Sequence, residues 1–137
     1  MLLLARRLAL PALERLGPTL LDDVAVPKPA LPQLITRIEE IARVRELVIG
    51  TFGHAGDGNL HPTIVFDAAS EDRAYAAFDD IVQATLALDG TITGEHGVGT
   101  LKTPFLTAMV GQAERDLMRR IKLAFDPNGI LNPGKAI

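Results

Sequence analysis

The chain has 137 residues, a length that fits one domain, and 47% of them are hydrophobic, so a buried core can form. Its formal net charge of −3 disfavours nucleic acid as a partner, because nucleic acid selects a basic surface. Cysteine is absent, which excludes disulfides and thiolate chemistry and fits the cytoplasm, where we expect the protein. No apolar run approaches the roughly 20 residues that cross a bilayer, so we expect no transmembrane segment.

The first part of the chain alternates helix and strand. Leucines between charged residues predict a helix over 2–16, which a Gly-Pro pair ends. A short strand is expected at 23–27, where a proline stops it. Apolar residues then recur at spacings of three and four from Leu31 to Ala42, which predicts an amphipathic helix.

The second part contains two strands that flank a glycine-rich turn, followed by two helices. Strands are predicted over 47–52, 60–66 and 91–93, and helices over 71–88 and 112–125. A turn and an apolar tail end the chain. Because strands joined as hairpins are mixed with helices, the sequence predicts one α+β domain over 1–137.

Two of the three histidines, His54 and His61, flank the central turn. A hairpin centred between Asp57 and Gly58 would place these histidines directly opposite each other. Their Cβ atoms would then be about 4.5–5.5 Å apart, a distance from which two imidazoles can bind one metal ion. For this pair alone, histidines that are merely solvated or hydrogen bonded are an equally good interpretation.

Glu95 and His96 follow the next predicted strand, in a second glycine-rich segment. With His54 and His61, Glu95 completes three protein ligands that leave positions open, which is typical of a catalytic metal site. One of Glu95 and His96 can bind metal while the other faces a substrate, and a neutral histidine is suited to removing a proton from a hydroxyl group. No side chain of the protein accepts a hydride, so a redox cofactor must come from elsewhere.

Three segments of the sequence form distinctive motifs: 53–62 (GHAGDGNLHP), 94–99 (GEHGVG) and 125–135 (FDPNGILNPGK). They resemble the motifs of the FAD-linked oxidase C-terminal domain family, of the glycolate oxidase FAD subunit and D-lactate dehydrogenase type. The resemblance implies a ferredoxin-like α+β cap domain, with an antiparallel sheet covered by helices. It also implies a separate FAD-binding domain or subunit as a partner, which is absent from this chain.

The resemblance further implies a role for individual side chains. His54, His61 and Glu95 would hold a divalent metal, such as zinc or manganese. His96 would take the hydroxyl proton of the substrate while a hydride passes to FAD. Two residues are assigned by resemblance alone: Arg6 would bind the substrate carboxylate and Asn132 would lie near the flavin.

Leu21 and Thr63 stand where family members that oxidise a dicarboxylate carry lysine and asparagine. The resemblance therefore implies a small 2-hydroxyacid substrate, glycolate or D-lactate, and a chain that is inactive alone. Two alternatives stay open. The chain could be a truncated, non-catalytic module that binds metal or associates into homo-oligomers. It could also be a small metallohydrolase that uses His54, His61 and Glu95.

Overall fold

A computed structural model describes the backbone of residues 2–137 and the side chains from Arg7 onward. The chain divides into two compact units, Met1–Gly94 and Glu95–Ile137. Whether these units work as the one domain that the sequence suggests stays a prediction. Among the described residues, no helix combines the length and the apolar character needed to cross a bilayer.

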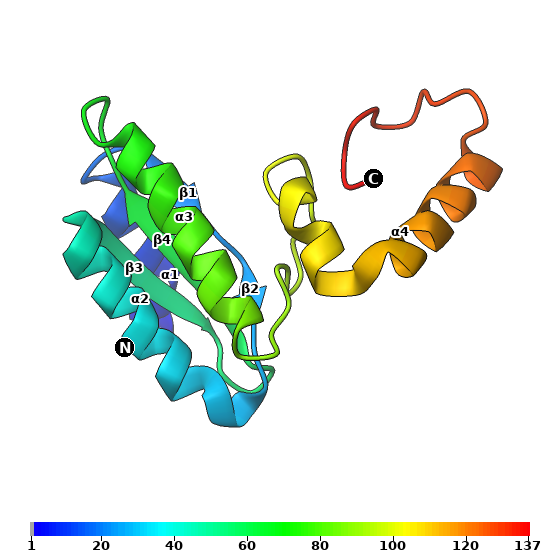
Figure 1. Cartoon of the computed structure of the whole chain (residues 1–137). Helices are drawn as coiled ribbons and strands as arrows, with labels where there is room; N and C mark the ends of the chain where they lie inside the picture. Colours follow the sequence, from blue (N-terminus) through cyan, green and yellow to red (C-terminus); the bar gives the residue numbers. More distant parts are fainter. Residues whose placement is uncertain (1) are drawn as a thin grey trace. The chain divides into compact units, whose positions relative to one another are not determined.

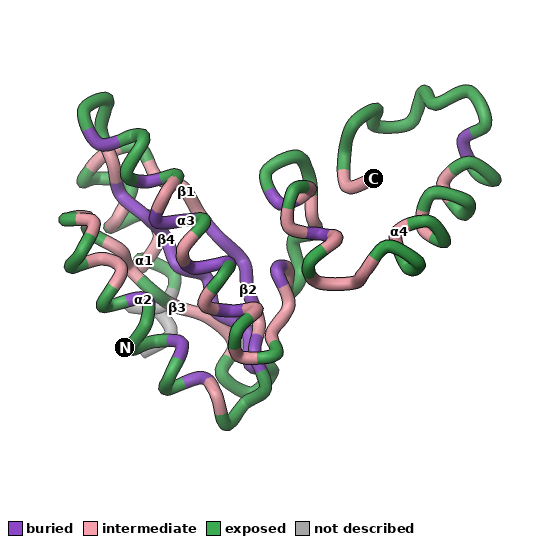
Figure 2. The backbone as a smooth tube through the Cα atoms, viewed as in Figure 1, coloured by how far each residue is buried: buried purple, intermediate pink, exposed green. Residues whose placement is uncertain are grey.

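An antiparallel sheet forms the centre of the first unit (Figure 1). Its middle strand is β4 (Asn59–Val65), which is buried along its whole length (Figure 2). Strand β3 (Val48–His54) pairs with one edge of β4. Strands β1 (Thr19–Leu21) and β2 (Val24–Ala25) pair one after the other with the opposite edge. The sheet and its helices confirm the α+β class.

Helices lie on both faces of this sheet (Figure 1). One face is covered by α2 (Leu31–Arg45) and α3 (Glu71–Leu86), and the other carries α1 (Leu2–Glu14). A 3-10 turn, Lys28–Ala30, leads into α2. The core is built mainly from aliphatic side chains of β4, α2 and α3, together with one phenylalanine: Leu34, Ile38, Ile64, Phe78, Ile81 and Val82.

The second unit contains one long helix and turns. A 3-10 turn, Thr103–Phe105, leads into α4 (Leu106–Phe125). The helix is interrupted at Gly111, whose φ of 82° and ψ of 171° are not helical. The predicted helix over 112–125 therefore corresponds to the part of α4 that follows the interruption. Residues 126–137 form turns and bends without a strand.

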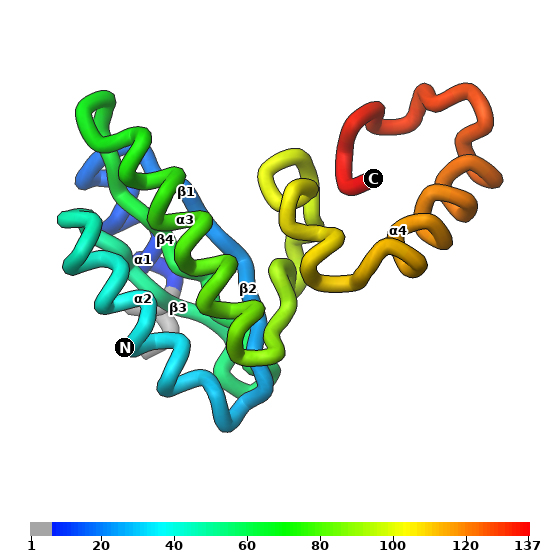
Figure 3. Tube along the Cα trace, in the orientation of Figure 1, coloured from blue at the N-terminus to red at the C-terminus, as the bar shows by residue number. Residues whose placement is uncertain are grey.

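Two short segments differ from the sequence predictions. The expected strand over 91–93 forms only an isolated bridge, between Thr91 and Ala25. Strand β1 was not expected, since three residues are too short to show an alternating pattern. Each segment pairs with a part of the chain that is far away in the sequence: Thr91 with Ala25, and β1 with β4. Figure 3 shows β1 and β2 beside β4.

Candidate metal and substrate site

The predicted pairing of His54 with His61 is wrong by two residues. His61 is paired with Phe52, and His54 is paired with Asn59. The difference arises because residues 55–58 form a four-residue turn, in which the amide of Asp57 donates to the carbonyl of His54 (2.9 Å). The centre of the hairpin therefore lies earlier than expected.

Gly58 holds this turn in place. Its φ of +77° favours glycine, and its carbonyl accepts the amide of Val26 at 3.0 Å. A Cβ atom at Gly58 would lie 2.1 Å from the carbonyl oxygen of Val26. The strand that follows the turn is thus fixed against the segment after β2.

The two histidines nevertheless meet. A shift of two residues keeps each side chain on the same face of a sheet, whereas a shift of one would reverse it. The ring centroids of His54 and His61 are 5.4 Å apart, with ring planes at 89°. One nitrogen of each ring lies within 4.8 Å of the other. His61 is only 6% exposed, and His54 is partly buried.

The histidines lie on the sheet face that carries α1. Gly50 is paired with Thr63, two residues from His61 on the same face. A Cβ atom at Gly50 would lie 2.4 Å from Leu13, so α1 packs on this face. The predicted substrate ligand Arg6 belongs to α1, but its side chain lies outside the described residues.

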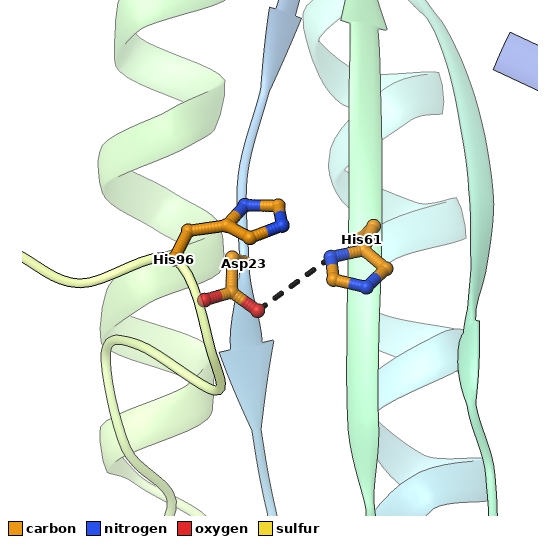
Figure 4. A group of neighbouring side chains, drawn as sticks. All are labelled: Asp23, His61 and His96. Atoms are coloured by element: carbon orange, nitrogen blue, oxygen red, sulfur yellow. Dashed lines mark ion pairs between the residues drawn. The ribbon is translucent and has the colours of Figure 1, made fainter.

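Asp23 is a site residue that the sequence did not suggest. Leu21 pairs with Thr63 and Val24 pairs with Leu60, so the same register places Asp23 directly across from His61. The Asp23 side chain is almost completely buried, and its Oδ1 lies 3.5 Å from His61 Nδ1 (Figure 4). A sequence signal could hardly reveal it, because His61 is 38 positions away in the chain.

Asp23 also binds the segment that leads to Glu95. Its Oδ2 accepts hydrogen bonds from the Thr93 hydroxyl (3.1 Å) and from the Gly94 amide (2.8 Å). Asn59 fills the space beside Gly94, because a Cβ atom there would lie 2.6 Å from the Asn59 side chain. The end of the first unit is therefore held by Asp23 and closely packed against Asn59.

Glu95 and His96 begin the second unit. The Nε2 atom of His96 lies 3.9 Å from Oε1 of Glu95, and both side chains are about half exposed. The third predicted residue of this unit, Asn132, is exposed and has a φ of 47°. Its carbonyl accepts the amide of Lys135 at 3.2 Å. Asn132 is therefore in a tight turn.

Asp126 organises the segment around Asn132. Its buried carboxylate accepts hydrogen bonds from the side-chain ammonium of Lys122 and from the backbone amides of Ile130 and Leu131, the two amides at 2.9 Å each. The hydrogen bond from Lys122 and those from the two amides lower the pKa of Asp126, against an opposing effect of desolvation. The terminal motif is thus held by a charged carboxylate.

Comparison with known proteins assigns the chain to a family. The family model described as "FAD linked oxidases, C-terminal domain" matches residues 1–136. The chain belongs to this family. The resemblance of the three sequence motifs is thereby confirmed.

The relatives of this family domain include proteins with named activities. "Glycolate oxidase subunit GlcD" of Bacillus subtilis is 48% identical over 135 residues, which cover 96% of the chain and 29% of the relative. "D-lactate dehydrogenase [cytochrome], mitochondrial" of Arabidopsis thaliana is 42% identical over 121 residues, which cover 86% of the chain and 21% of the relative. The chain therefore spans less than a third of the length of these relatives.

Proposed function

We propose that the chain supplies the substrate- and proton-handling part of an FAD-dependent oxidation of a small 2-hydroxyacid, glycolate or D-lactate, to its 2-oxoacid. The observation that carries this proposal is the pair of neighbouring imidazoles, His54 and His61, on one face of the sheet. Membership of the FAD-linked oxidase family and similarity to GlcD and D-lactate dehydrogenase support it.

A divalent metal such as zinc or manganese fits the two histidines. Their ring nitrogens lie within 4.8 Å of each other, and an ion between them could reach both at the usual distance of about 2.0–2.1 Å. Strands flank His61 on both edges of β4: it is paired with Phe52 of β3, and the register of β1 and β2 places Asp23 across from it. The site therefore offers two ligands whose backbones are already ordered.

Glu95 is the third ligand in this proposal. It follows Gly94 directly, and consecutive Cα atoms are about 3.8 Å apart. The Gly94 amide donates to Asp23, and Asp23 also faces His61, so the residue before Glu95 is bound to the carboxylate beside this histidine. Two imidazoles and one carboxylate leave coordination positions open for a substrate.

The chain's own residues would handle the substrate as follows. Arg6 binds the carboxylate, for which a planar guanidinium is well suited. His96 accepts the hydroxyl proton at a ring nitrogen, as a neutral imidazole can near physiological pH. A bound divalent cation supplies positive charge that favours loss of this proton, and FAD supplies the hydride acceptor. Asn132 contributes to the surface near the flavin.

The side chains of Leu21 and Thr63 favour the proposal that the substrate is small. They are direct partners across β1 and β4, two positions from His61 along β4. Neither side chain carries a charge that could bind a second carboxylate. This local environment favours glycolate or D-lactate over a dicarboxylate.

The partner of the chain would be an FAD-binding domain or subunit. Helix α4 presents an apolar stripe, Leu117, Ile121 and Phe125, whose members follow one another at four-residue intervals on one side of the helix. They are 49%, 51% and 81% exposed. Such a surface is typical of an interface. In the absence of the FAD-binding partner, the stripe also favours self-association of the chain, which is the second candidate behaviour.

The activity can be tested in a chimera. The 135 matching residues of Bacillus subtilis GlcD would be replaced by this chain, and the purified protein would be mixed with glycolate or D-lactate without oxygen. We expect the flavin absorbance to bleach. The same chimera with His96→Asn should bind FAD normally but bleach at least 100-fold more slowly, because the general base typically contributes 10²–10⁴-fold.

A matched control for this experiment is Asp57→Asn, which changes an exposed turn residue near His54 and should leave bleaching unchanged. A folded chimera that binds FAD but is reduced by no 2-hydroxyacid would contradict the proposed activity.

A further inference from the structure

The two oxygens of the Asp23 carboxylate serve two different segments. Oδ2 accepts the Thr93 hydroxyl and the Gly94 amide, and Oδ1 faces Nδ1 of His61 at 3.5 Å (Figure 4). The side chain is 1% exposed, so water hardly competes for these positions. A single buried carboxylate thus lies between the strand that carries His61 and the segment that precedes Glu95.

The geometry restricts the imidazole of His61. A neutral imidazole carries its proton on one nitrogen and has a lone pair on the other. A carboxylate facing Nδ1 favours the proton on Nδ1, because an ionised carboxylate can only accept hydrogen bonds. The lone pair is then on Nε2, the nitrogen that Asp23 does not face.

We propose that Asp23 is a positioning residue, which fixes His61 as the Nδ1–H tautomer and so presents Nε2 to a metal ion. Carboxylates that orient a metal-binding histidine in this way raise its basicity and fix its ring. Through Gly94, the same carboxylate sets the start of the segment that carries Glu95. Asp23 therefore orients one proposed metal ligand, His61, and also binds the residue before Glu95.

The part of this inference that concerns the metal depends on the proposed function, whereas the tautomer does not. The tautomer can be read without metal from the ¹⁵N resonances of His61 in the whole 137-residue chain. We expect wild-type His61 to carry its proton on Nδ1 at a pH where the ring is neutral. A proton on Nε2 would overturn the inference, and this result needs no variant.

The Asp23→Asn variant tests the cause. The amide keeps one oxygen that can accept from Gly94, but it removes the negative charge that favours a proton on Nδ1. We expect a mixture of tautomers at His61, and a zinc affinity 10- to 100-fold below that of the wild type, as is usual when such a carboxylate is replaced. An unchanged tautomer and an unchanged affinity would overturn the inference.

Two control variants separate Asp23's contacts from general effects. Asp57→Asn removes the same charge from an exposed turn position near His54 and should change neither tautomer nor affinity. Thr93→Val removes the hydroxyl donor but leaves the carboxylate in front of His61, so the tautomer should stay Nδ1–H. A tautomer change in Thr93→Val equal to that in Asp23→Asn would contradict a direct action of Asp23 on His61.

Zinc titration of the wild type distinguishes the two proposals. A shift of the Nε2 resonance on zinc binding supports both. Wild-type chain that binds neither zinc nor manganese would refute the metal site, while the tautomer result would still decide the contact between Asp23 and His61. A metal-induced shift that is larger at Nδ1 than at Nε2 would mean that the metal binds on the side of Asp23, and it would overturn the positioning role.

Discussion

The two units of the chain bury their apolar residues to very different extents. In the first unit, β4 is buried along its length, and Ile64 is completely inaccessible. In the second unit, the apolar stripe of α4 is exposed, and so are Ile130 and Leu131 (Figure 2). An amphipathic helix of a globular protein normally buries its apolar face.

The difference teaches that the two units have different sources of stability. The sheet, α2 and α3 bury an apolar core between them, so the first unit is stabilised by its own buried side chains. The surface of α4 is instead suited to a partner, which we propose to be the FAD-binding domain. Four changes to the chain test this comparison.

The largest effect is expected for Ile64→Ala. Truncating a completely buried isoleucine removes buried apolar surface and leaves a cavity. The free energy of unfolding, measured by urea denaturation, should therefore fall by about 2–5 kcal/mol. The matched change Ile121→Ala, at a residue that is half exposed on α4, should stay within about 0.5 kcal/mol. Equal losses for the two variants would contradict the contrast between the units.

Gly94→Ala tests the packing at the end of the first unit. The added Cβ atom would lie 2.6 Å from the buried Asn59 side chain, which must shift, so we expect a loss of about 1–3 kcal/mol in unfolding free energy. Zinc affinity should fall as well, because the chain before Glu95 moves. Gly56→Ala is the control, since no atom lies within 4 Å of its added Cβ. A neutral Gly94→Ala variant would exclude close packing there.

Ile121→Glu tests the apolar stripe. A charge on this surface should weaken self-association in sedimentation measurements by at least tenfold, because an unpaired charge is costly in an apolar interface. Gln112→Glu adds the same charge at an exposed position near the start of the helix after Gly111, outside the stripe, and should have little effect. A wild-type chain that stays monomeric at high concentration would count against self-association.

The smallest effect is a pH dependence of the segment after α4. Because its hydrogen bonds, first with Lys122, lower the pKa of Asp126, they stabilise the folded segment above the ordinary pKa of aspartate, about 3.9. This stabilisation is lost as the pH falls through the lowered pKa. The amide resonances of Ile130 and Leu131 should therefore shift only in acid, below about pH 4. An Asp126→Asn variant should lack this transition.

Local patterns account for the part of the fold that the sequence predicted. The spacing of Leu34, Ile38 and their neighbours indicated α2, and alternating or apolar runs indicated β3 and β4. The predicted register of β3 and β4 was wrong because it depends on the turn over 55–58, in which Gly58 has a φ of +77° and its carbonyl accepts the amide of Val26. A contact 32 positions away is not visible in a local pattern.

The candidate site shows the same limit. His54 and His61 could be found because their residue type and turn-flanking positions suggest metal binding. Asp23 could not, since its place opposite His61 follows from the pairing of β1 and β2 with β4. The metal-ligand roles of His54, His61 and Glu95 stay predictions, and so do the roles of His96, Arg6 and Asn132.

The central proposal is that the two histidines of the first unit bind a metal ion and that Glu95 is its third ligand. Calorimetric titration of the chain with zinc tests it most directly. We expect one ion per chain, with an affinity that falls at least 100-fold in His54→Ala and at least tenfold in Glu95→Gln. No stoichiometric binding by the wild type, or equal binding by all three proteins, would contradict the account.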